Sequence, residues 1–206
     1  MTAGSNPPVR ARVRSRAVPT PVPPAAPRGE ATVQVAHTAA LDPEALVAAR
    51  ELLDIVFDGE LTDEDWDHGL GGMHALVWQD GHLVGHGSVV QRQLLHGGRA
   101  RRVGYVEAVG VHPDRQRRGI GGLVLDALEA VIAGGYELGA LASTDEGLAL
   151  YRRRGWLPWR GRTSAMTPAG IRRTPDGDDC VHVFPLDTPM DLDGELVCDW
   201  REGDVW

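Results

Sequence analysis

A short glycine-rich run is the part of this sequence best suited to chemistry. It reads Gln-Arg-Arg-Gly-Ile-Gly-Gly at residues 116–122 and directly follows a strand-like segment at residues 103–111. Gly119, Gly121 and Gly122 leave backbone N–H groups uncovered at a helix start, where the macrodipole and unpaired donors favour an anion. The run therefore predicts an anion-binding turn that suits a pyrophosphate.

The surroundings of the glycine run narrow its interpretation. It is not a Walker A loop, because the Gly-Lys-Ser/Thr ending is missing. It is a poor dinucleotide fingerprint, because the strands before it look antiparallel and no ribose-binding acid is evident. A tight strand-to-helix turn without a ligand remains the alternative, since isolated glycine motifs are weak evidence.

The charge distribution indicates a cationic small molecule as the partner. The chain has 206 residues and is 42% hydrophobic, which suffices for one core but hardly for two domains. Residues 1–30 hold five arginines and one glutamate, whereas residues 31–206 carry 16 basic and 28 acidic residues, a net charge of −12. Nucleic-acid binding depends on basic side chains, so the acidic body argues against it and suits a polycationic amine.

Cysteine usage favours a reducing compartment, and hydropathy argues against a membrane span. Cys180 and Cys198 are two thiols in a chain of ordinary size, which favours free cysteines over a disulfide framework. No segment is apolar enough to span a membrane, and the N-terminal arginines precede a Pro-rich stretch rather than a signal-peptide core. The histidines lack zinc-ligand spacing. We expect a cytoplasmic protein without a membrane or metal partner.

Local patterns predict a disordered Pro/Arg-rich tail at residues 1–30 and one domain at residues 31–206. A helix is expected to begin at Asp42-Pro43 and run to Phe57, and a second helix begins near Thr62. Turns at residues 80–81 and 97–98 join three strands into an antiparallel meander whose last strand leads into the glycine run.

The second half of the domain predicts a β-α-β-α-β order. A helix follows the glycine run and stops at Gly134-Gly135, and a strand is expected at residues 137–142. A further helix at residues 145–154 ends at Gly155, with final strands near Leu157 and at residues 181–185. The predicted fold is α/β, with a mixed sheet and flanking helices.

Three ordered motifs resemble the GCN5-related N-acetyltransferase (GNAT) superfamily. Gln116-x-x-Gly119-x-Gly121 matches its acetyl-CoA motif, and residues 109–113 and 150–156 resemble its strand end and its later Tyr-x-x-x-Gly-Phe-like segment. Further stretches are similar to mycobacterial-type aminoglycoside 2′-N-acetyltransferases, at residues 71–76, 105–107, 154–159 and 198–206. The resemblance covers about residues 33–206 and implies a GNAT-like single domain.

The resemblance implies acetyl-CoA as cosubstrate, without a metal. The implied cofactor contacts are the strand end and the turn: Val109, Gly110, Val111, Arg117, Arg118, Gly119, Ile120, Gly121 and Gly122. Gly110 invites a β-bulge or a close backbone approach, which would aim a free N–H at the thioester carbonyl. A packing glycine is the alternative.

The resemblance also implies catalytic roles for Glu107 and Tyr151. Glu107 shares strand parity with Tyr105 and Val109, so its carboxylate is expected to face the cleft as general base. A free glutamate titrates near a pH of about 4.3, so proton relay through water is expected, with ammonium anchoring as the alternative. Tyr151 is the expected acid toward the CoA thiolate, with a core aromatic as the alternative.

Acidic residues and the C-terminus are the implied substrate contacts, because a polyamine sugar needs several anions. The set is Glu60, Glu107, Ala108, Asp176, Asp178, Asp179, Asp204 and Trp206. The Trp206 indole is expected to cover a sugar ring while its carboxylate pairs with an ammonium, with a merely docked tail as the alternative. Related enzymes carry Asp at position 60, and Gly177 interrupts their Asp-rich loop, so the contacts of residues 176–179 stay open.

The expected reaction is direct acetyl transfer, in a ternary complex, from acetyl-CoA to the 2′-amine of aminoglycosides, which would confer antibiotic resistance. One alternative is acetylation of an endogenous amine, such as a cell-envelope amino sugar or a polyamine. The other is a non-catalytic CoA-sensing protein. Related acetyltransferases commonly form dimers, so we expect a homodimer.

Overall fold

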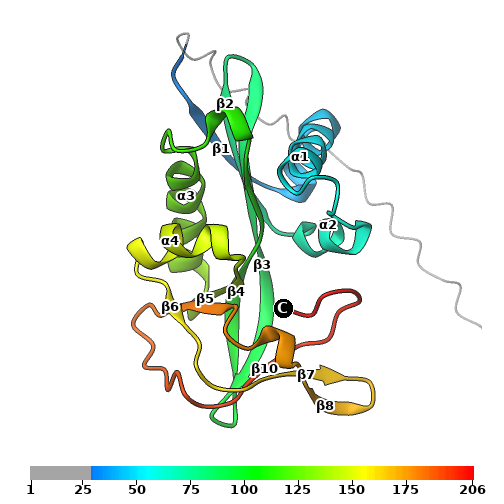
Figure 1. Cartoon of the computed structure of the whole chain (residues 1–206), viewed down its shortest axis with the longest axis vertical. Helices are drawn as coiled ribbons and strands as arrows, with labels where there is room; N and C mark the ends of the chain where they lie inside the picture. The colour runs from blue at the N-terminus through cyan, green and yellow to red at the C-terminus, as the bar shows by residue number, and fades with distance from the viewer. Residues whose placement is uncertain (1–28) are drawn as a thin grey trace, which may run out of the picture.

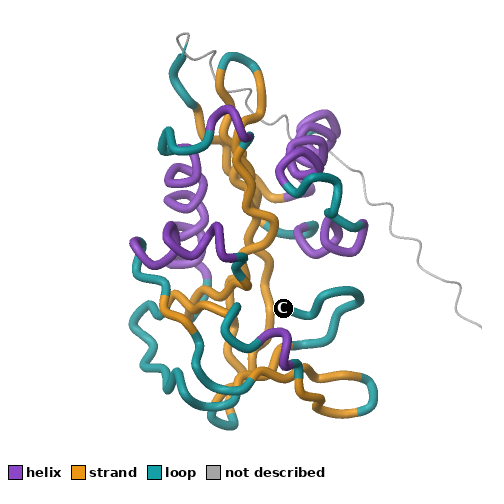
Figure 2. Tube along the Cα trace, viewed as in Figure 1, coloured by secondary structure: helices purple, strands orange, loops and turns teal. Residues whose placement is uncertain are grey.

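The computed structural model describes residues 29–206; residues 1–28, which hold most of the predicted tail, lie outside the described residues. Figures 1 and 2 show a central sheet with α1 (Pro43–Val56) and α2 (Asp63–Gly69) on one face. The other face carries α3 (Ile120–Gly135) and α4 (Asp145–Arg153). This mixed arrangement confirms the predicted α/β fold class.

One mixed sheet runs through the described part of the chain. Its strands are β1 (Thr32–His37), β2 (Met73–Gln79), β3 (His82–His96), β4 (Arg99–Val111), β5 (Leu138–Ala142), β6 (Leu157–Pro158), β7 (Thr163–Thr167), β8 (Gly170–Arg173), β9 (Val181–Phe184) and β10 (Leu196–Cys198). The order is β6-β9-β5-β4-β3-β10-β7-β8, and β2 also pairs with β3 and carries β1. The long β3 therefore pairs with β2 near its start and with β10 near its end.

Most of the predicted elements are confirmed. Pro43 occupies the first turn of α1, and Thr62 caps α2 by a capping box with Asp65. The two hairpin turns join β2, β3 and β4, and α4 ends before Gly155, whose φ is +89°. Four short strands were not predicted: β1, β7 and β10, which pair with distant segments, and β8, which forms a hairpin with β7.

Strands β4 and β5 separate after a short parallel pairing. They pair through Val103–Tyr105 and Leu138–Ala140, after which β5 continues along β9. Beyond Tyr105, β4 has its β3 neighbour but no strand on its β5 side within residues 29–206. A row of backbone N–H and C=O groups is therefore available there to an extended ligand.

Two buried histidines lie on neighbouring strands under α1 and α2. His74 is 0% exposed and His86 is 1% exposed, and their rings contact through Nδ1 of His74 and Nε2 of His86 at 3.0 Å. Burial lowers the pKa of each from 6.5 to about 4. Both rings are therefore neutral at physiological pH.

Lowering the pH from 7 to 5 is expected to reduce the free energy of unfolding by about 2 kcal/mol for each of these two histidines. Their pKa is lower in the fold than in the unfolded chain, so the unfolded chain takes up protons first. Their contribution is complete above pH 6.5 and is lost as the pH falls toward 4. Urea denaturation at both pH values measures the change.

The matched control is His82→Asn, which removes an exposed histidine from the same strand as His86. This variant should lose as much stability between pH 7 and pH 5 as the wild type does. Equal stability of the wild type at the two pH values would contradict a neutral buried pair.

Candidate active site

The predicted anion-binding turn is open and rich in unpaired donors. The backbone N–H groups of residues 117–122 donate no hydrogen bond among the described residues, whereas the N–H of Leu123 donates to Gly119 O at 3.1 Å. Gly119 caps α3 in the left-handed region with a φ of +85°, and no side chain caps this end. Six consecutive donors at the start of a 16-residue helix suit a pyrophosphate.

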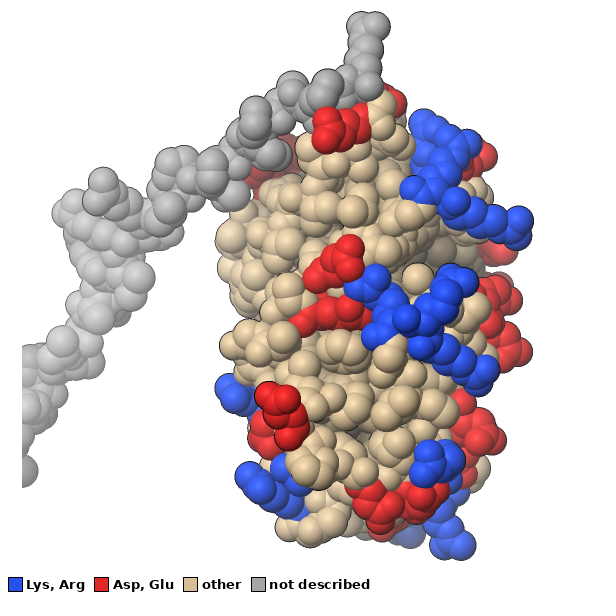
Figure 3. Space-filling model, turned by 90° about the vertical axis from the view of Figure 1, so that its left-hand side faces the viewer, with Lys and Arg blue, Asp and Glu red and all other residues tan. Residues whose placement is uncertain are grey.

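The surface around α3 and α4 carries both signs of charge. Figure 3 looks onto this face, where arginines and acidic side chains lie side by side. Arg154, for example, pairs with Asp126 and Glu129 of α3. Arg117 and Arg118, the first two residues of the amide turn, have exposed side chains that can add charge to an anion site.

Strand β4 is interrupted by a β-bulge at Ala108 and Val109. Ser88 of β3 pairs with Glu107 and His86 pairs with Gly110, so two residues of β4 lie opposite Gly87. Ala108 has a φ of +49°, which is rare for a residue with a side chain. The bulge therefore lies immediately before Gly110, the position from which a bulge was predicted.

The bulge also corrects the predicted strand parity. Glu107 shares a face with Tyr105 as expected, but Val109 packs with the core beneath α3, on the opposite face. Gly110 returns to the face of Glu107, where an added Cβ would lie 3.0 Å from Leu53 of α1. Gly110 is thus closely packed against α1, as the alternative interpretation expects.

Glu107 forms an ion pair with Arg201 from the C-terminal segment. Their side chains are 12% and 15% exposed, so water screens this pair little. The guanidinium binds Oε1 of Glu107, donates to Asp204 O at 2.9 Å and lies over the Tyr105 ring at 5.4 Å. Arg201 therefore fixes the carboxylate and leaves its Oε2 without a hydrogen bond among the described residues.

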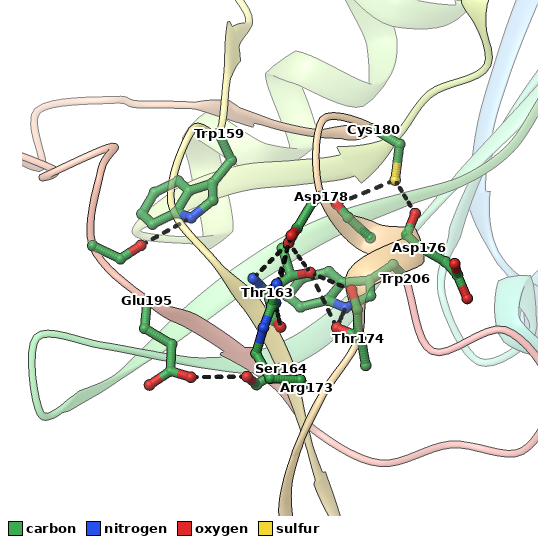
Figure 4. Close-up of polar contacts among 12 residues, drawn as sticks. Trp159, Thr163, Ser164, Arg173, Thr174, Asp176, Asp178, Cys180, Glu195 and Trp206 are labelled. Carbon is green, nitrogen blue, oxygen red and sulfur yellow. Dashed lines mark hydrogen bonds and ion pairs between the residues drawn. The ribbon is translucent and has the colours of Figure 1, made fainter.

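A second arginine docks the C-terminal segment on the sheet. Arg92 is 4% exposed and donates to Asp199 Oδ1 at 2.7 Å and to Val205 O at 2.8 Å. The Trp206 indole is buried and donates to Thr174 Oγ1 at 2.7 Å (Figure 4). The indole is therefore packed inside the protein, as the docked-tail alternative expects.

Asp178 is committed to holding its own loop. It accepts from the backbone N–H of Thr163 at 3.0 Å and pairs with Arg173 at 2.6 Å (Figure 4). The Arg173 hydrogen bond is the main reason that the pKa of Asp178 lies far below its usual range. A substrate contact by Asp178, one of the predicted possibilities, would therefore compete with this local pairing.

The other predicted substrate residues fall into two groups. Glu60 is exposed in the loop between α1 and α2, on the face of the sheet that carries Glu107. Asp204 is exposed and caps the N–H of Trp206, and the loop with Asp176 and Asp179 packs on Trp206 through Gly177. The C-terminal segment thus connects the acidic loop to Glu107.

Tyr151 lies on α4 with its ring packed against Trp156 at a centroid distance of 5.9 Å. It is 7% exposed, and burial raises its pKa to about 12. Its hydroxyl makes no hydrogen bond within residues 29–206 and stays protonated at neutral pH. The Tyr151 hydroxyl is thus an available hydrogen-bond donor on α4, although the ring is also part of the core.

Sequence reasoning missed Arg201, Arg92 and His86. Arg201 is the single Lys or Arg after Arg173 in an acidic C-terminal stretch. This isolated charge was the sequence signal that could have indicated an ion pair. His86 stands among inward-facing residues of a strand buried on both faces. Its partner could not be inferred, because the contact depends on the position of the bulge.

Comparisons with known proteins agree with this geometry. The sequence profile of the acetyltransferase (GNAT) domain matches residues 38–158. An aminoglycoside 2′-N-acetyltransferase of Mycolicibacterium fortuitum is 47% identical over 179 residues, which cover 85% of this chain and 92% of that protein. The chain belongs to the GNAT acetyltransferase family. The resemblance seen in the motifs is thereby confirmed.

Several solved structures share the fold at low sequence identity. An acetyltransferase of Brucella melitensis in complex with acetyl-CoA has a TM-score of 0.53 and 19% identity, covering 80% of this chain and 94% of that one. Escherichia coli ElaA has a TM-score of 0.55 and 14% identity, covering 75% of this chain and 99% of that one. A probable N-acyltransferase of Enterococcus faecalis has a TM-score of 0.54 and 17% identity. The match covers 65% of this chain and 34% of that one.

Gly122→Glu is expected to weaken acetyl-CoA binding about tenfold or more, because it places a negative charge within the amide turn. An added Cβ at Gly122 meets nothing within 4 Å, so the fold should tolerate the change. Isothermal titration calorimetry with acetyl-CoA measures the effect. Gly134→Glu, at the other end of α3 and equally open, is the control; similar dissociation constants for both variants would exclude the turn as the anion site.

Proposed function

We propose that this protein transfers acetyl from acetyl-CoA to the 2′-amine of aminoglycosides. The structural observation that carries the acetyl-CoA part is the uncovered edge of β4, which leads directly into six unpaired amides. The substrate part rests on the relative that is 47% identical over nearly its whole length. The expected effect in the cell is resistance to such antibiotics.

The acetyl-CoA side is formed by backbone groups. Residues 117–122 would hold the pyrophosphate through their N–H groups, with Arg117 and Arg118 adding charge. Residues 109–111 would pair with the pantetheine arm as a further strand does, since β5 has moved away from β4. The pyrophosphate and pantetheine contacts would both be made by backbone groups, and a glycine-rich turn leaves such groups uncovered.

The amine side is formed by acidic groups on the face of α1, α2 and the C-terminal segment. Glu60, Asp204 and the terminal carboxylate of Trp206 would attract the ammonium groups of the substrate. Asp176 and Asp179 extend this set, whereas Asp178 is held by Arg173. The backbone of Ala108 would lie beside the reacting amine.

Glu107 would accept the proton that leaves the amine. The amine nitrogen attacks the thioester carbon, the carbon–sulfur bond breaks and the CoA sulfur leaves as a thiolate. The proton passes through water to Oε2 of Glu107, because Arg201 occupies Oε1. Direct transfer needs no covalent acyl-enzyme.

Tyr151 would stabilise the departing thiolate by a hydrogen bond. Its pKa of about 12 exceeds that of an ordinary thiol, about 8.5, so complete proton transfer is uphill. Donation without full transfer is therefore its proposed role. The thiolate then takes its proton from solvent.

We also propose a cytoplasmic homodimer that binds neither nucleic acid nor membrane. Cys180 and Cys198 are unpaired, which fits a reducing compartment. Among residues 29–206, no helix is long and apolar enough to cross a membrane. Light scattering of the purified protein tests the dimer.

The substrate proposal is tested with two aminoglycosides that differ only at the 2′ position, one carrying an amine and the other a hydroxyl. Acetyl-CoA-dependent release of CoA, followed with a thiol reagent, is expected with the amine alone. Release with both would place acetylation at another amine. Binding of acetyl-CoA without release would instead support an endogenous amine or a sensing role.

Glu107→Gln is expected to lower kcat about 100-fold or more, because the amide cannot accept the proton. Arg201→Gln is the matched control, since it breaks the same ion pair but keeps the carboxylate. It should change kcat only a few-fold while the KM for the aminoglycoside rises. If both variants lose kcat equally, Glu107 acts by holding the C-terminal segment and not as the base.

A further inference from the structure

A line of hydrogen bonds crosses the sheet and ends at the β4 bulge. Thr38 Oγ1 lies 2.8 Å from His74 Nε2, and His74 Nδ1 lies 3.0 Å from His86 Nε2. The line ends where His86 Nδ1 lies 3.0 Å from the carbonyl oxygen of Ala108. Both histidines are buried, so this line is shielded from water.

The carbonyl fixes the direction of every hydrogen bond in the line. A carbonyl oxygen only accepts, so Nδ1 of His86 must carry the proton and its Nε2 must accept from His74. The Nε2 of His74 then accepts from the Thr38 hydroxyl at 2.8 Å, a shorter contact than the 3.3 Å from this hydroxyl to the Gly72 carbonyl oxygen. All three donors point toward Ala108, an arrangement in which each hydrogen bond polarises the next.

The Ala108 carbonyl belongs to the same peptide group as the N–H of Val109. This peptide is trans, so its C=O and N–H point in opposite directions. The carbonyl points toward the His86 ring, and the N–H of Val109 therefore points away from that ring. Val109 has no ladder partner in either neighbouring strand.

We propose that His86 is a positioning residue that holds the Ala108–Val109 peptide so that the N–H of Val109 polarises the thioester carbonyl of acetyl-CoA. The inference deepens the proposed function and rests on it. It also moves the expected donor from Gly110 to Val109. Polarising donors of this kind stabilise the oxyanion that forms when an amine attacks the thioester.

The hydrogen bond from His86 also explains how the bulge persists. Ala108 adopts a φ of +49°, a conformation that costs energy for a residue with a Cβ and survives only where its surroundings enforce it. If the hydrogen bond from His86 were lost, the peptide could rotate and carry the N–H of Val109 away from the thioester. Glu107, one residue earlier, would move with it.

The test compares two polar replacements of His86. Asn places a donor where Nδ1 lies, whereas Gln places its donor at the position of Nε2 and leaves the Ala108 carbonyl unpaired. Infrared difference spectroscopy with acetyl-CoA, carbon-13 labelled at the thioester carbonyl, reports polarisation without any amine substrate. His82→Asn is the control, because His82 is exposed on the same strand.

The bound thioester stretch is expected to fall below that of free acetyl-CoA in the wild type, in His82→Asn and in His86→Asn. In His86→Gln it should return toward the free value, and kcat should fall about tenfold with the KM for acetyl-CoA little changed. Identical spectra and kcat for His86→Asn and His86→Gln would overturn the proposal. An unshifted stretch in the wild type would overturn it as well.

Failure of the proposed function gives a different result. A wild-type protein that polarises bound acetyl-CoA but acetylates no aminoglycoside would leave the role of His86 intact and refute the substrate. Turnover in the wild type, with equal behaviour of the Asn and Gln variants, would leave the substrate intact and refute the role of His86.

Discussion

The structure depends on the separation of β4 from β5. The two strands pair through three residues of β4 and then diverge, which leaves the following N–H and C=O groups of β4 without a strand on one side. Unpaired backbone groups are costly when buried, so this edge must meet water or a ligand that pairs with it. The amide turn lies at the end of the same edge, so one extended ligand would have contacts along its whole length.

The bulge changes which side chains of β4 lie on each face of the sheet next to the gap between β4 and β5. A regular β4 would place Glu107, Val109 and Val111 on one face. With two residues opposite Gly87, Val109 and Val111 join the core beneath α3, while Glu107 stays on the face of α1, α2 and the C-terminal segment. The carboxylate and the backbone donors can then approach a reacting carbonyl from different directions.

Local patterns in the sequence were sufficient for the helices, the hairpins and the amide turn, because caps, glycines and periodicity act over a few residues. They could not reveal contacts such as that between Arg201 and Glu107, which are 94 residues apart. Nor could they locate the bulge: Gly110 drew attention as a glycine, but Ala108 adopts the positive φ. The predicted parity of Val109 was wrong for that reason. The burial of the Trp206 indole depends on Thr174, which is 32 residues earlier.

On the proposed amine side, charge would be divided between binding and chemistry. Arg201 already neutralises one oxygen of Glu107, so this carboxylate offers a substrate ammonium less attraction than a free one would. Exposed acids such as Glu60 and Asp204 have no such partner and suit long-range attraction of a polycation. A base that does not bind the ammonium tightly is better placed to take its proton through water, because tight pairing with the charged form would stabilise the ground state that catalysis must leave.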